Sequence, residues 1–185
     1  MDVGSRDSET RSCEVYTIGH SNSSAEKIIG LLKTYNVQAL VDVRSFPYSQ
    51  YAPQFNREAF AENLRLSGIE YGFGGDSLGG HPKDPTCYKD SRRGRKKVNY
   101  REISRRPWFQ KAIARLVEAA SERRTAIMCS EENPSQCHRH QLIAQILSGM
   151  NVKVWHIRGQ GTLEDAKSLP FSESVATHEL NLEKF

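Results

Sequence analysis

Residues 128–139 carry most of the side chains that could do chemistry. They read Met-Cys-Ser-Glu-Glu-Asn-Pro-Ser-Gln-Cys-His-Arg, so two thiols, two carboxylates, an imidazole and a guanidinium share one short segment. An apolar run, residues 125–128, precedes the segment, and the apolar spacing of an amphipathic helix begins near His138. Open α/β proteins place their reactive groups where a strand ends and a helix begins. The segment therefore predicts a functional site.

Cys137 is a candidate nucleophile. It would lie at the start of the predicted helix, where the helix dipole and His138 or Arg139 lower the pKa of a thiol. A reactive thiolate there would make the chain a cysteine-dependent transferase or hydrolase, whereas a buried cysteine that only caps the helix is the alternative. The spacing from Cys129 to Arg139 does not fit the C-x5-R loop of cysteine phosphatases.

The same segment holds enough donor atoms for zinc, from Cys129, Cys137, His138 and His140. However, the seven-residue gap between the two cysteines and the adjacent Cys137–His138 pair match no usual spacing of a structural zinc site. His138 and His140 would also point in different directions on a helix. We therefore expect no metal ion and no other cofactor.

Arg139 also suits an anion site. With the free backbone N–H groups of the helix start, Ser21 and Asn22, it would form a receptor for phosphate or another anion. This interpretation needs no reactive thiol. It predicts a phosphate-bearing small molecule or a nucleic acid as the partner.

Five predicted strands alternate with four predicted helices. The strands are expected at residues 15–18, 39–43, 69–73, 125–128 and 152–157. The helices are expected at about residues 23–35, 56–66, 107–120 and 138–148, and a capping box from Ser23 to Glu26 opens the first. Such alternation implies right-handed crossovers between parallel strands. The predicted fold class is α/β, with a single open, mainly parallel sheet of about five strands and helices on both faces, a Rossmann-like three-layer arrangement.

Parallel strands bring the loops that follow them to one edge of the sheet, so polar residues distant in sequence should share a site there. The candidate catalytic residues are His20, Asp42, Glu131 and Cys137. The candidate substrate-binding or anion-binding residues are Ser21, Asn22, Arg44, Ser45, His138 and Arg139.

Asp42 lies between Val41 and Val43 in an apolar strand, so its carboxylate must be paired. Two interpretations stay open. Asp42 and Arg44 could form a buried clamp that holds the following turn, or Asp42 could act as a base or as an orienter of His20.

The net charge of +4 is mild, but basic residues gather between residues 89 and 106. We expect nucleic-acid contact from Arg92, Arg93, Arg95, Lys96 and Lys97. The alternatives are a solvated, mobile insertion and a nuclear-import signal.

The length suits a single domain, predicted at residues 13–161 with a basic insertion at 81–106. Residues 1–12 are expected to form a flexible tail and residues 162–185 a C-terminal extension without periodicity. No apolar run is long enough for a membrane span, the start of the chain lacks a secretory pattern, and the four cysteines are scattered. We therefore expect an intracellular protein, cytoplasmic or nuclear, that does not bind membranes.

Several short motifs resemble the family known as domain of unknown function 488. They are Thr17-Ile18-Gly19-His20-Ser21, Leu40-Val41-Asp42-Val43-Arg44 with Pro47, Gln54-Phe55-Asn56, Leu78-Gly79-Gly80, Met128-Cys129-Ser130-Glu131, Cys137-His138-Arg139 and Val154-Trp155-His156-Ile157. The resemblance covers roughly residues 15–160 and implies a small α/β domain with a polar site at the strand ends. The chain departs from the family at Gln50, where an Arg is frequent, and at Gln160-Gly161, where Asp-Gly is usual.

Two functional hypotheses from different classes follow. The first is an enzyme of unknown reaction that acts on a phosphate-bearing or nucleic-acid-related substrate at the C-terminal edge of the sheet. The second is a non-catalytic nucleic-acid or nucleotide binding module that uses the basic insertion. An enclosed pocket with a perturbed carboxylate would favour the enzyme.

Overall fold

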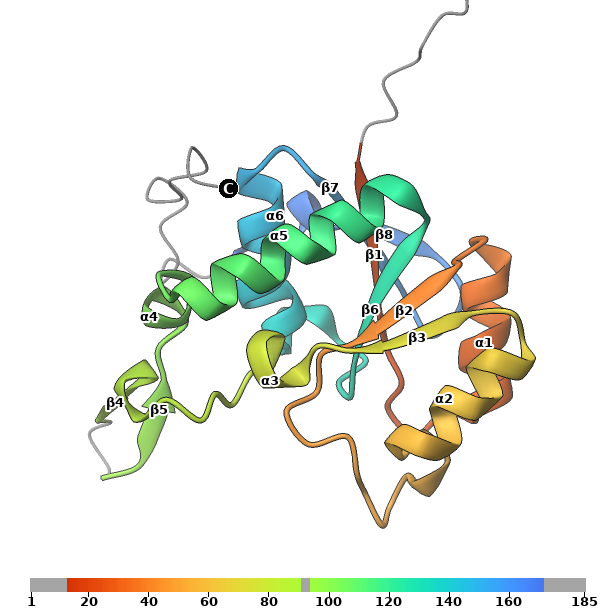
Figure 1. Ribbon diagram of the computed structural model, residues 1–185, viewed down its shortest axis with the longest axis horizontal. Helices are drawn as coiled ribbons and strands as arrows, with labels where there is room; N and C mark the ends of the chain where they lie inside the picture. Colours follow the sequence, from red (N-terminus) through yellow and green to blue (C-terminus); the bar gives the residue numbers. More distant parts are fainter. Residues whose placement is uncertain (1–12, 91–93, 172–185) are drawn as a thin grey trace, which may run out of the picture.

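The computed structural model describes residues 13–90 and 94–171. Six strands form one mainly parallel sheet in the order β3-β2-β6-β1-β7-β8 (Figure 1). Their bounds are β1 Glu14–Gly19, β2 Ala39–Asp42, β3 Glu70–Phe73, β6 Thr125–Cys129, β7 Lys153–Ile157 and β8 Leu163–Asp165. The predicted tail at residues 1–12, the last part of the C-terminal extension, and Arg92 and Arg93 lie outside the described residues.

Helices cover both faces of the sheet, which confirms the predicted α/β class (Figure 1). Their bounds are α1 Ala25–Thr34, α2 Arg57–Leu66, α3 Gly75–Leu78, α4 Tyr100–Ser104, α5 Pro107–Glu122 and α6 Gln145–Gly149, with a π-helical segment, Arg139–Ala144, running directly into α6. One face packs against α1 and α2, and the other against α5, the π-helical segment and α6.

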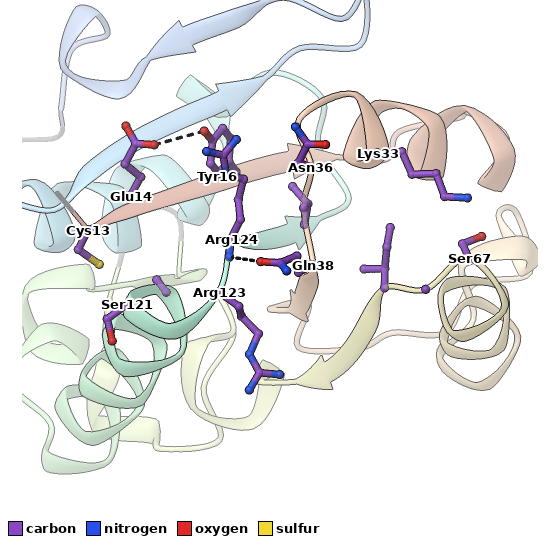
Figure 2. Close-up of a pocket in the computed structure, with 14 residues that line it drawn as sticks. Cys13, Glu14, Tyr16, Lys33, Asn36, Gln38, Ser67, Ser121, Arg123 and Arg124 are labelled. Atoms are coloured by element: carbon purple, nitrogen blue, oxygen red, sulfur yellow. Dashed lines mark hydrogen bonds between the residues drawn. The ribbon is translucent and has the colours of Figure 1, made fainter. Parts of the chain in front are cut away.

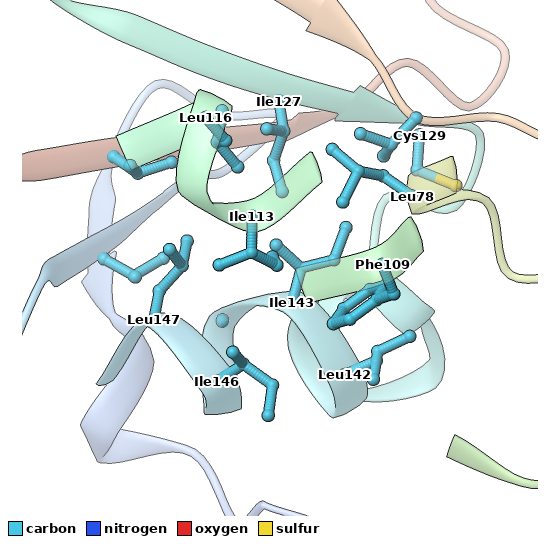
Figure 3. Close-up of a cluster of buried hydrophobic side chains, with 14 of the residues drawn as sticks. Leu78, Phe109, Ile113, Leu116, Ile127, Cys129, Leu142, Ile143, Ile146 and Leu147 are labelled. Atoms are coloured by element: carbon cyan, nitrogen blue, oxygen red, sulfur yellow. The ribbon is translucent and has the colours of Figure 1, made fainter. Parts of the chain in front are cut away.

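The central strand β6 shows why the sheet has two covered faces. Ala126 and Met128 pack with the core of α1 and α2, whereas Ile127 and Cys129 pack with the core of α5 and α6 (Figure 3). All of β6 is buried, so its side chains alternate between two apolar layers. Each fully buried aliphatic side chain contributes about 1.5–3 kcal/mol to folding.

The first helix begins one residue later than its predicted cap. Ser24, and not Ser23, is the N-cap, and its Oγ accepts a hydrogen bond from the backbone N–H of Lys27 at 3.2 Å. The N–H of Ser23 donates instead to the carbonyl of His20 at 3.0 Å. Ser23 therefore closes the turn after β1, which carries His20.

The strand β8 lies in the segment that the sequence predicts to be an aperiodic extension. It pairs antiparallel with β7, and Arg158 links the two strands through Glu164 at 2.5 Å. A three-residue strand is too short to show an alternating pattern, so the sequence carried no signal for it.

The basic insertion contains a two-stranded antiparallel hairpin, β4 Tyr88–Asp90 and β5 Lys96–Val98. Its lysines point to solvent, while Tyr88 and Val98 pack against the main core. The insertion therefore presents charge outward from an anchored base. Among the described residues, no helix combines the length and apolar character needed to cross a bilayer.

Candidate functional site

Four side chains gather where β6 ends, and we call them the thiol cluster: Cys129, Glu131, Cys137 and His138. The Cys129 Sγ lies 3.0 Å from Glu131 Oε2 and 3.7 Å from His138 Nδ1. The Cys137 Sγ lies 3.8 Å from the same Nδ1 atom. Both cysteines and His138 are buried, whereas Glu131 is exposed. The carboxylate is thus the member of the cluster that also meets solvent.

The His138 ring is fixed from two sides. Its Nε2 lies 3.2 Å from the carbonyl oxygen of Val43, and because a carbonyl only accepts, Nε2 carries the proton. When the ring is neutral, its other nitrogen, Nδ1, directs a lone pair at the two sulfur atoms. Gly80 packs against the ring so closely that a Cβ there would lie 2.9 Å from it, so this position requires glycine.

The two thiols share their protons unequally. The Cys129 thiol donates to Cys137, and with His138 and Arg139 nearby this lowers the pKa of Cys137 to about 5 despite its burial. The same hydrogen bond, together with burial and the Cys137 and Glu131 charges, raises the pKa of Cys129. Burial alone would raise the pKa of Glu131, but thiol hydrogen bonds offset it and the pKa is lowered. The surroundings therefore favour ionisation of Cys137 and Glu131 over ionisation of Cys129.

His20, Asp42 and Arg44 form a second group on the opposite face of the same edge. Arg44 Nη2 contacts Asp42 Oδ2 at 2.6 Å and Arg44 Nη1 lies 3.3 Å from His20 Nε2. Asp42 also accepts a hydrogen bond from Tyr71 Oη at 2.8 Å. In the described structure the hydrogen bond of His20 within this group is with Arg44 and not with Asp42. The geometry favours the buried clamp, with Arg44 rather than Asp42 in contact with His20.

His20 is held as a neutral ring. Its Nδ1 lies 2.8 Å from the carbonyl of Ser21 and must donate, so Nε2 is the atom that accepts from Arg44. The ring stacks on Phe55 with centroids 4.1 Å apart. Burial is the main cause that lowers the pKa of His20 to about 4; the hydrogen bond to the Ser21 carbonyl opposes it, and the Arg44 charge acts in the same direction as burial.

Arg139 is fully buried and has little capacity left for a ligand. Its guanidinium donates to the backbone carbonyls of Glu131 and Glu132 and, at 3.2 Å, to Thr17 Oγ1. These bonds hold the loop that carries Glu131, so the geometry favours a structural role rather than anion binding.

A chain of buried hydrogen bonds continues from Thr17 to the C-terminal segment. Thr17 Oγ1 lies 2.7 Å from His156 Nδ1, His156 Nε2 lies 3.0 Å from His140 Nδ1, and His140 Nε2 lies 3.2 Å from the Pro170 carbonyl. Burial is the main cause that lowers the pKa of both histidines, so both rings are neutral. Because the terminal carbonyl only accepts, each neutral ring then donates through Nε2 and accepts at Nδ1.

The remaining predicted residues lie at the same edge in less constrained positions. Ser21 and Asn22 are exposed after β1. Ser45 Oγ accepts the backbone N–H of His81 at 2.9 Å, so it fixes the loop that follows α3. Arg95, Lys96 and Lys97 are exposed on or beside the hairpin.

The loops after β1 and β6 join the two groups of side chains. The N–H groups of His20 and Ser21 donate to the carbonyls of Cys129 and Ser130 at 3.1 and 2.7 Å. A Cβ on Gly19 would lie 1.8 Å from the Glu131 carbonyl oxygen, so only glycine allows this approach. His20, Asp42, Arg44, Glu131 and Arg139 thus lie at one edge of the sheet, but in separate groups on its two faces rather than in one shared site.

A groove of about 1000 Å³ lies at the opposite edge, where the strands begin (Figure 2). Two of its cationic side chains are engaged: Arg123 with Glu70 and Glu122, and Arg124 with the Tyr35 carbonyl and the Tyr16 ring. None of the predicted site residues lines it. We therefore place the candidate site at the strand ends rather than in this groove.

Several contributors were absent from the predicted site. Cys129, a candidate zinc donor by sequence, ends β6 two residues before Glu131 and belongs to the thiol cluster. Glu132 accepts two bonds from Arg158 and one from the Gly159 N–H, and these lower its pKa to about 2. Glu132 lies in the chemically rich segment 128–139 and Gly80 in a family motif, but the sequence does not show what they contact, because their partners are distant in the chain.

Comparison with known proteins gives a family and no further relative. No curated protein matches the chain, and no solved structure matches it. The family described as "Domain of unknown function DUF488" matches residues 24–147, from the cap of α1 into α6. This range includes Asp42, Arg44 and the whole thiol cluster. The chain belongs to the DUF488 family.

Proposed function

We propose that the chain is an enzyme that acts on a nucleic-acid-related substrate, with the thiol cluster as its reaction centre. One observation carries the proposal: a solvent-exposed carboxylate, Glu131, lies 3.0 Å from a thiol in an otherwise buried group of two cysteines and a histidine. An ionised carboxylate in that place suits a general acid–base, able to exchange protons between a substrate and the cluster.

A loop of exposed aromatic rings supports the substrate class. Phe46, Tyr48 and Tyr51 are 76%, 56% and 89% exposed. Their loop leaves β2 beside the Val43 carbonyl that holds His138, and it returns at Phe55, which stacks on His20. Nucleobases stack on exposed rings of this kind with a gain of about 1–3 kcal/mol per base.

The loop that carries Phe46, Tyr48 and Tyr51 is held in place by hydrogen bonds of its own. The Ser49 N–H donates to Asn56 Oδ1 at 2.7 Å, and the Arg57 N–H donates to the Pro47 carbonyl at 3.1 Å. Tyr48 Oη donates to Glu58 at 2.7 Å. We name Phe46, Tyr48 and Tyr51 the aromatic loop and propose that it bears the bases of the substrate.

The proposed substrate also agrees with the exposed charge of the hairpin, where Lys89, Arg95, Lys96 and Lys97 meet solvent. In the alternative, non-catalytic function these residues would be the whole binding site. The four free cysteines support our proposal of a reducing, intracellular compartment.

A panel assay tests the proposed function. Purified protein would be incubated with nucleosides, nucleotides and single-stranded oligonucleotides, and products identified by mass spectrometry. We expect turnover of at least one class, and we expect Glu131→Gln to reduce the rate by about 100-fold or more. Glu122→Gln, at an exposed carboxylate on α5, is the matched control and should retain full activity.

Substrate binding is measured in the same assay. Tyr51→Ala should raise KM by roughly fivefold to a hundredfold through lost stacking and leave kcat nearly unchanged. Leu66→Ala, at an exposed apolar side chain on α2, is its control. An inactive wild-type protein across the panel, or full activity in Glu131→Gln, would show that the proposed function is wrong.

A cysteine-dependent transferase or hydrolase is the second candidate. The Arg139 N–H lies 3.5 Å from Cys137 Sγ, which is the contact expected of a stabilised thiolate nucleophile. In that case an electrophilic substrate should leave a covalent adduct on Cys137, visible in the intact mass of the protein. An adduct that forms equally on Cys137→Ser would exclude this candidate.

A further inference from the structure

The donor atoms of the thiol cluster have the spacing of a tetrahedral metal site. With zinc–sulfur and zinc–nitrogen bonds of about 2.3 and 2.0 Å, tetrahedral geometry puts sulfur and nitrogen ligands about 3.6 Å apart. His138 Nδ1 lies 3.7 Å from Cys129 Sγ and 3.8 Å from Cys137 Sγ. All three donor atoms lie within 4.8 Å of one another. An ion placed between them would need only small movements of the side chains.

The surroundings of His138 are those of a metal ligand. Metal-bound histidines nearly always donate their second ring N–H to a carbonyl or carboxylate, which fixes the tautomer. The Nε2–H of His138 donates to the carbonyl oxygen of Val43, and the backbone of Gly80 lies close to the ring. Nδ1 is therefore presented as a lone-pair donor toward the two sulfurs before any ion binds.

The local fold explains why the sequence spacing did not predict this site. A short turn, Pro134–Gln136, follows the loop and brings Cys137 back to the end of β6. Cys137 and His138 precede the π-helical segment, so their side chains are not constrained to the directions of a regular helix. His140, which seemed a fourth donor, bonds to His156 instead.

We propose that the thiol cluster binds one zinc-class divalent ion through Cys129, Cys137 and His138. The fourth position lies on the side of Glu131, which is exposed and two residues beyond the first ligand. Three protein ligands with an open fourth position are the mark of a catalytic zinc site. Zinc enzymes that act on nucleobases pair such ligands with a glutamate that is not itself a ligand.

The inference gives the proposed enzyme its chemistry, and in that respect it rests on the proposed function. A bound zinc-class ion activates a water molecule for attack on an electrophilic carbon. Glu131 would then take a proton from that water, the oxygen would form the new bond to the substrate carbon, and Glu131 would return the proton to the leaving group as its bond to that carbon breaks. Metal binding itself is independent of any substrate and is tested alone.

Cobalt titration of the full-length protein tests the site. The protein would be reduced and freed of metal, its four free thiols confirmed by intact mass, and Co²⁺ added without oxygen. We expect one equivalent to bind, with the strong visible bands of tetrahedral cobalt and thiolate-to-cobalt absorption in the near ultraviolet. Zn²⁺ should displace it.

Single substitutions assign the ligands. Cys129→Ser, Cys137→Ser and His138→Ala should each weaken Co²⁺ binding by about a hundredfold or more and lose the tetrahedral bands. Cys87→Ser, at a buried cysteine outside the cluster, is the matched control for folding and should bind as wild type does. Circular dichroism confirms that each variant is folded.

Two outcomes would overturn the metal inference: no stoichiometric binding by the reduced wild type, or binding that Cys137→Ser leaves unchanged. Glu131→Gln separates this inference from the proposed function, because it should keep the tetrahedral spectrum and lose catalysis. If Glu131→Gln retains both, the metal site stands and the proposed role of Glu131 fails.

Discussion

Arg139 donates to two backbone carbonyls and a hydroxyl from a fully buried position. Its sequence position, next to a cysteine and a histidine at a helix start, suggested an anion receptor. Burial was not visible in the sequence, because an arginine is rarely enclosed and its acceptors come from other segments. Arg139 lies at the edge of the sheet where the site is predicted, but its hydrogen bonds favour a structural role over anion binding.

We expect Arg139→Met to lower the free energy of unfolding by about 3 kcal/mol or more, because three acceptors lose a charged donor. Chemical denaturation measures the change. Arg65→Ala, which removes an exposed pair with Glu62, is the control and should cost at most about 1 kcal/mol. A fully stable Arg139→Met protein would contradict the structural role.

His156 predicts a pH dependence of stability. Burial, then the charge of Arg139, lowers its pKa to about 3, whereas an unfolded histidine titrates near 6.5. Between these values the unfolded state binds more protons, so stability is complete above pH about 6.5 and falls as pH decreases. The slope from this one residue reaches about 1.4 kcal/mol per pH unit.

His156→Gln should flatten that slope by up to one proton, because the substituted side chain does not titrate. Unfolding measured at several pH values between about 4 and 7 gives the comparison. His81→Gln, at an exposed histidine, should leave the slope unchanged. Equal slopes in wild type and His156→Gln would mean that His156 is not buried as a neutral ring.

At the scale of elements, apolar periodicity predicted the five parallel strands and the main helices. It worked because β6 and β1 are buried on both faces, and α5 and α1 carry clear apolar stripes. It failed for β8, because a strand of three residues is too short to show a pattern and forms through its pairing with β7. It also placed the first helix cap one residue early, because both Ser23 and Ser24 can cap and only backbone geometry selects between them.

The hairpin makes a prediction at the same scale. If it contacts nucleic acid, replacing Lys89, Lys96 and Lys97 by Gln should weaken binding of a single-stranded oligonucleotide and reduce its salt dependence. Each lost phosphate contact should lower the slope of log affinity against log salt by about 0.7. Fluorescence anisotropy at several salt concentrations measures both quantities.

The matched control replaces Lys27, Lys33 and Lys111, which are equally exposed on the helices α1 and α5. It removes the same net charge from elsewhere on the surface. If both triple variants reduce affinity equally, the effect belongs to total charge and not to the hairpin.

At the scale of the whole molecule, the sheet explains why the site could be located but not described. Strand order brings the ends of β2, β6 and β1 together, so the edge followed from the alternation of elements. Which side chains then touch depends on the two faces: Cys129 lies on the α5 side, while His20 meets Phe55 on the α2 side. That division depends on loop geometry, and no pattern in the sequence encodes it.

The whole-molecule view also separates two regions of opposite character. The starts of the strands border an open polar groove in which Arg123 and Arg124 contact neighbouring groups (Figure 2). The strand ends hold the thiol cluster, with its buried cysteines and histidine and the exposed Glu131, and so carry the donor atoms of the proposed metal site.

An element-specific diffraction measurement tests this account most directly. Crystals of the protein grown with Zn²⁺ would be measured on both sides of the zinc absorption edge. We predict one strong anomalous difference peak bounded by Cys129 Sγ, Cys137 Sγ and His138 Nδ1, with the Glu131 carboxylate beside its open position. A map with no zinc peak at these three residues, or with the two sulfur atoms joined to each other, would contradict it.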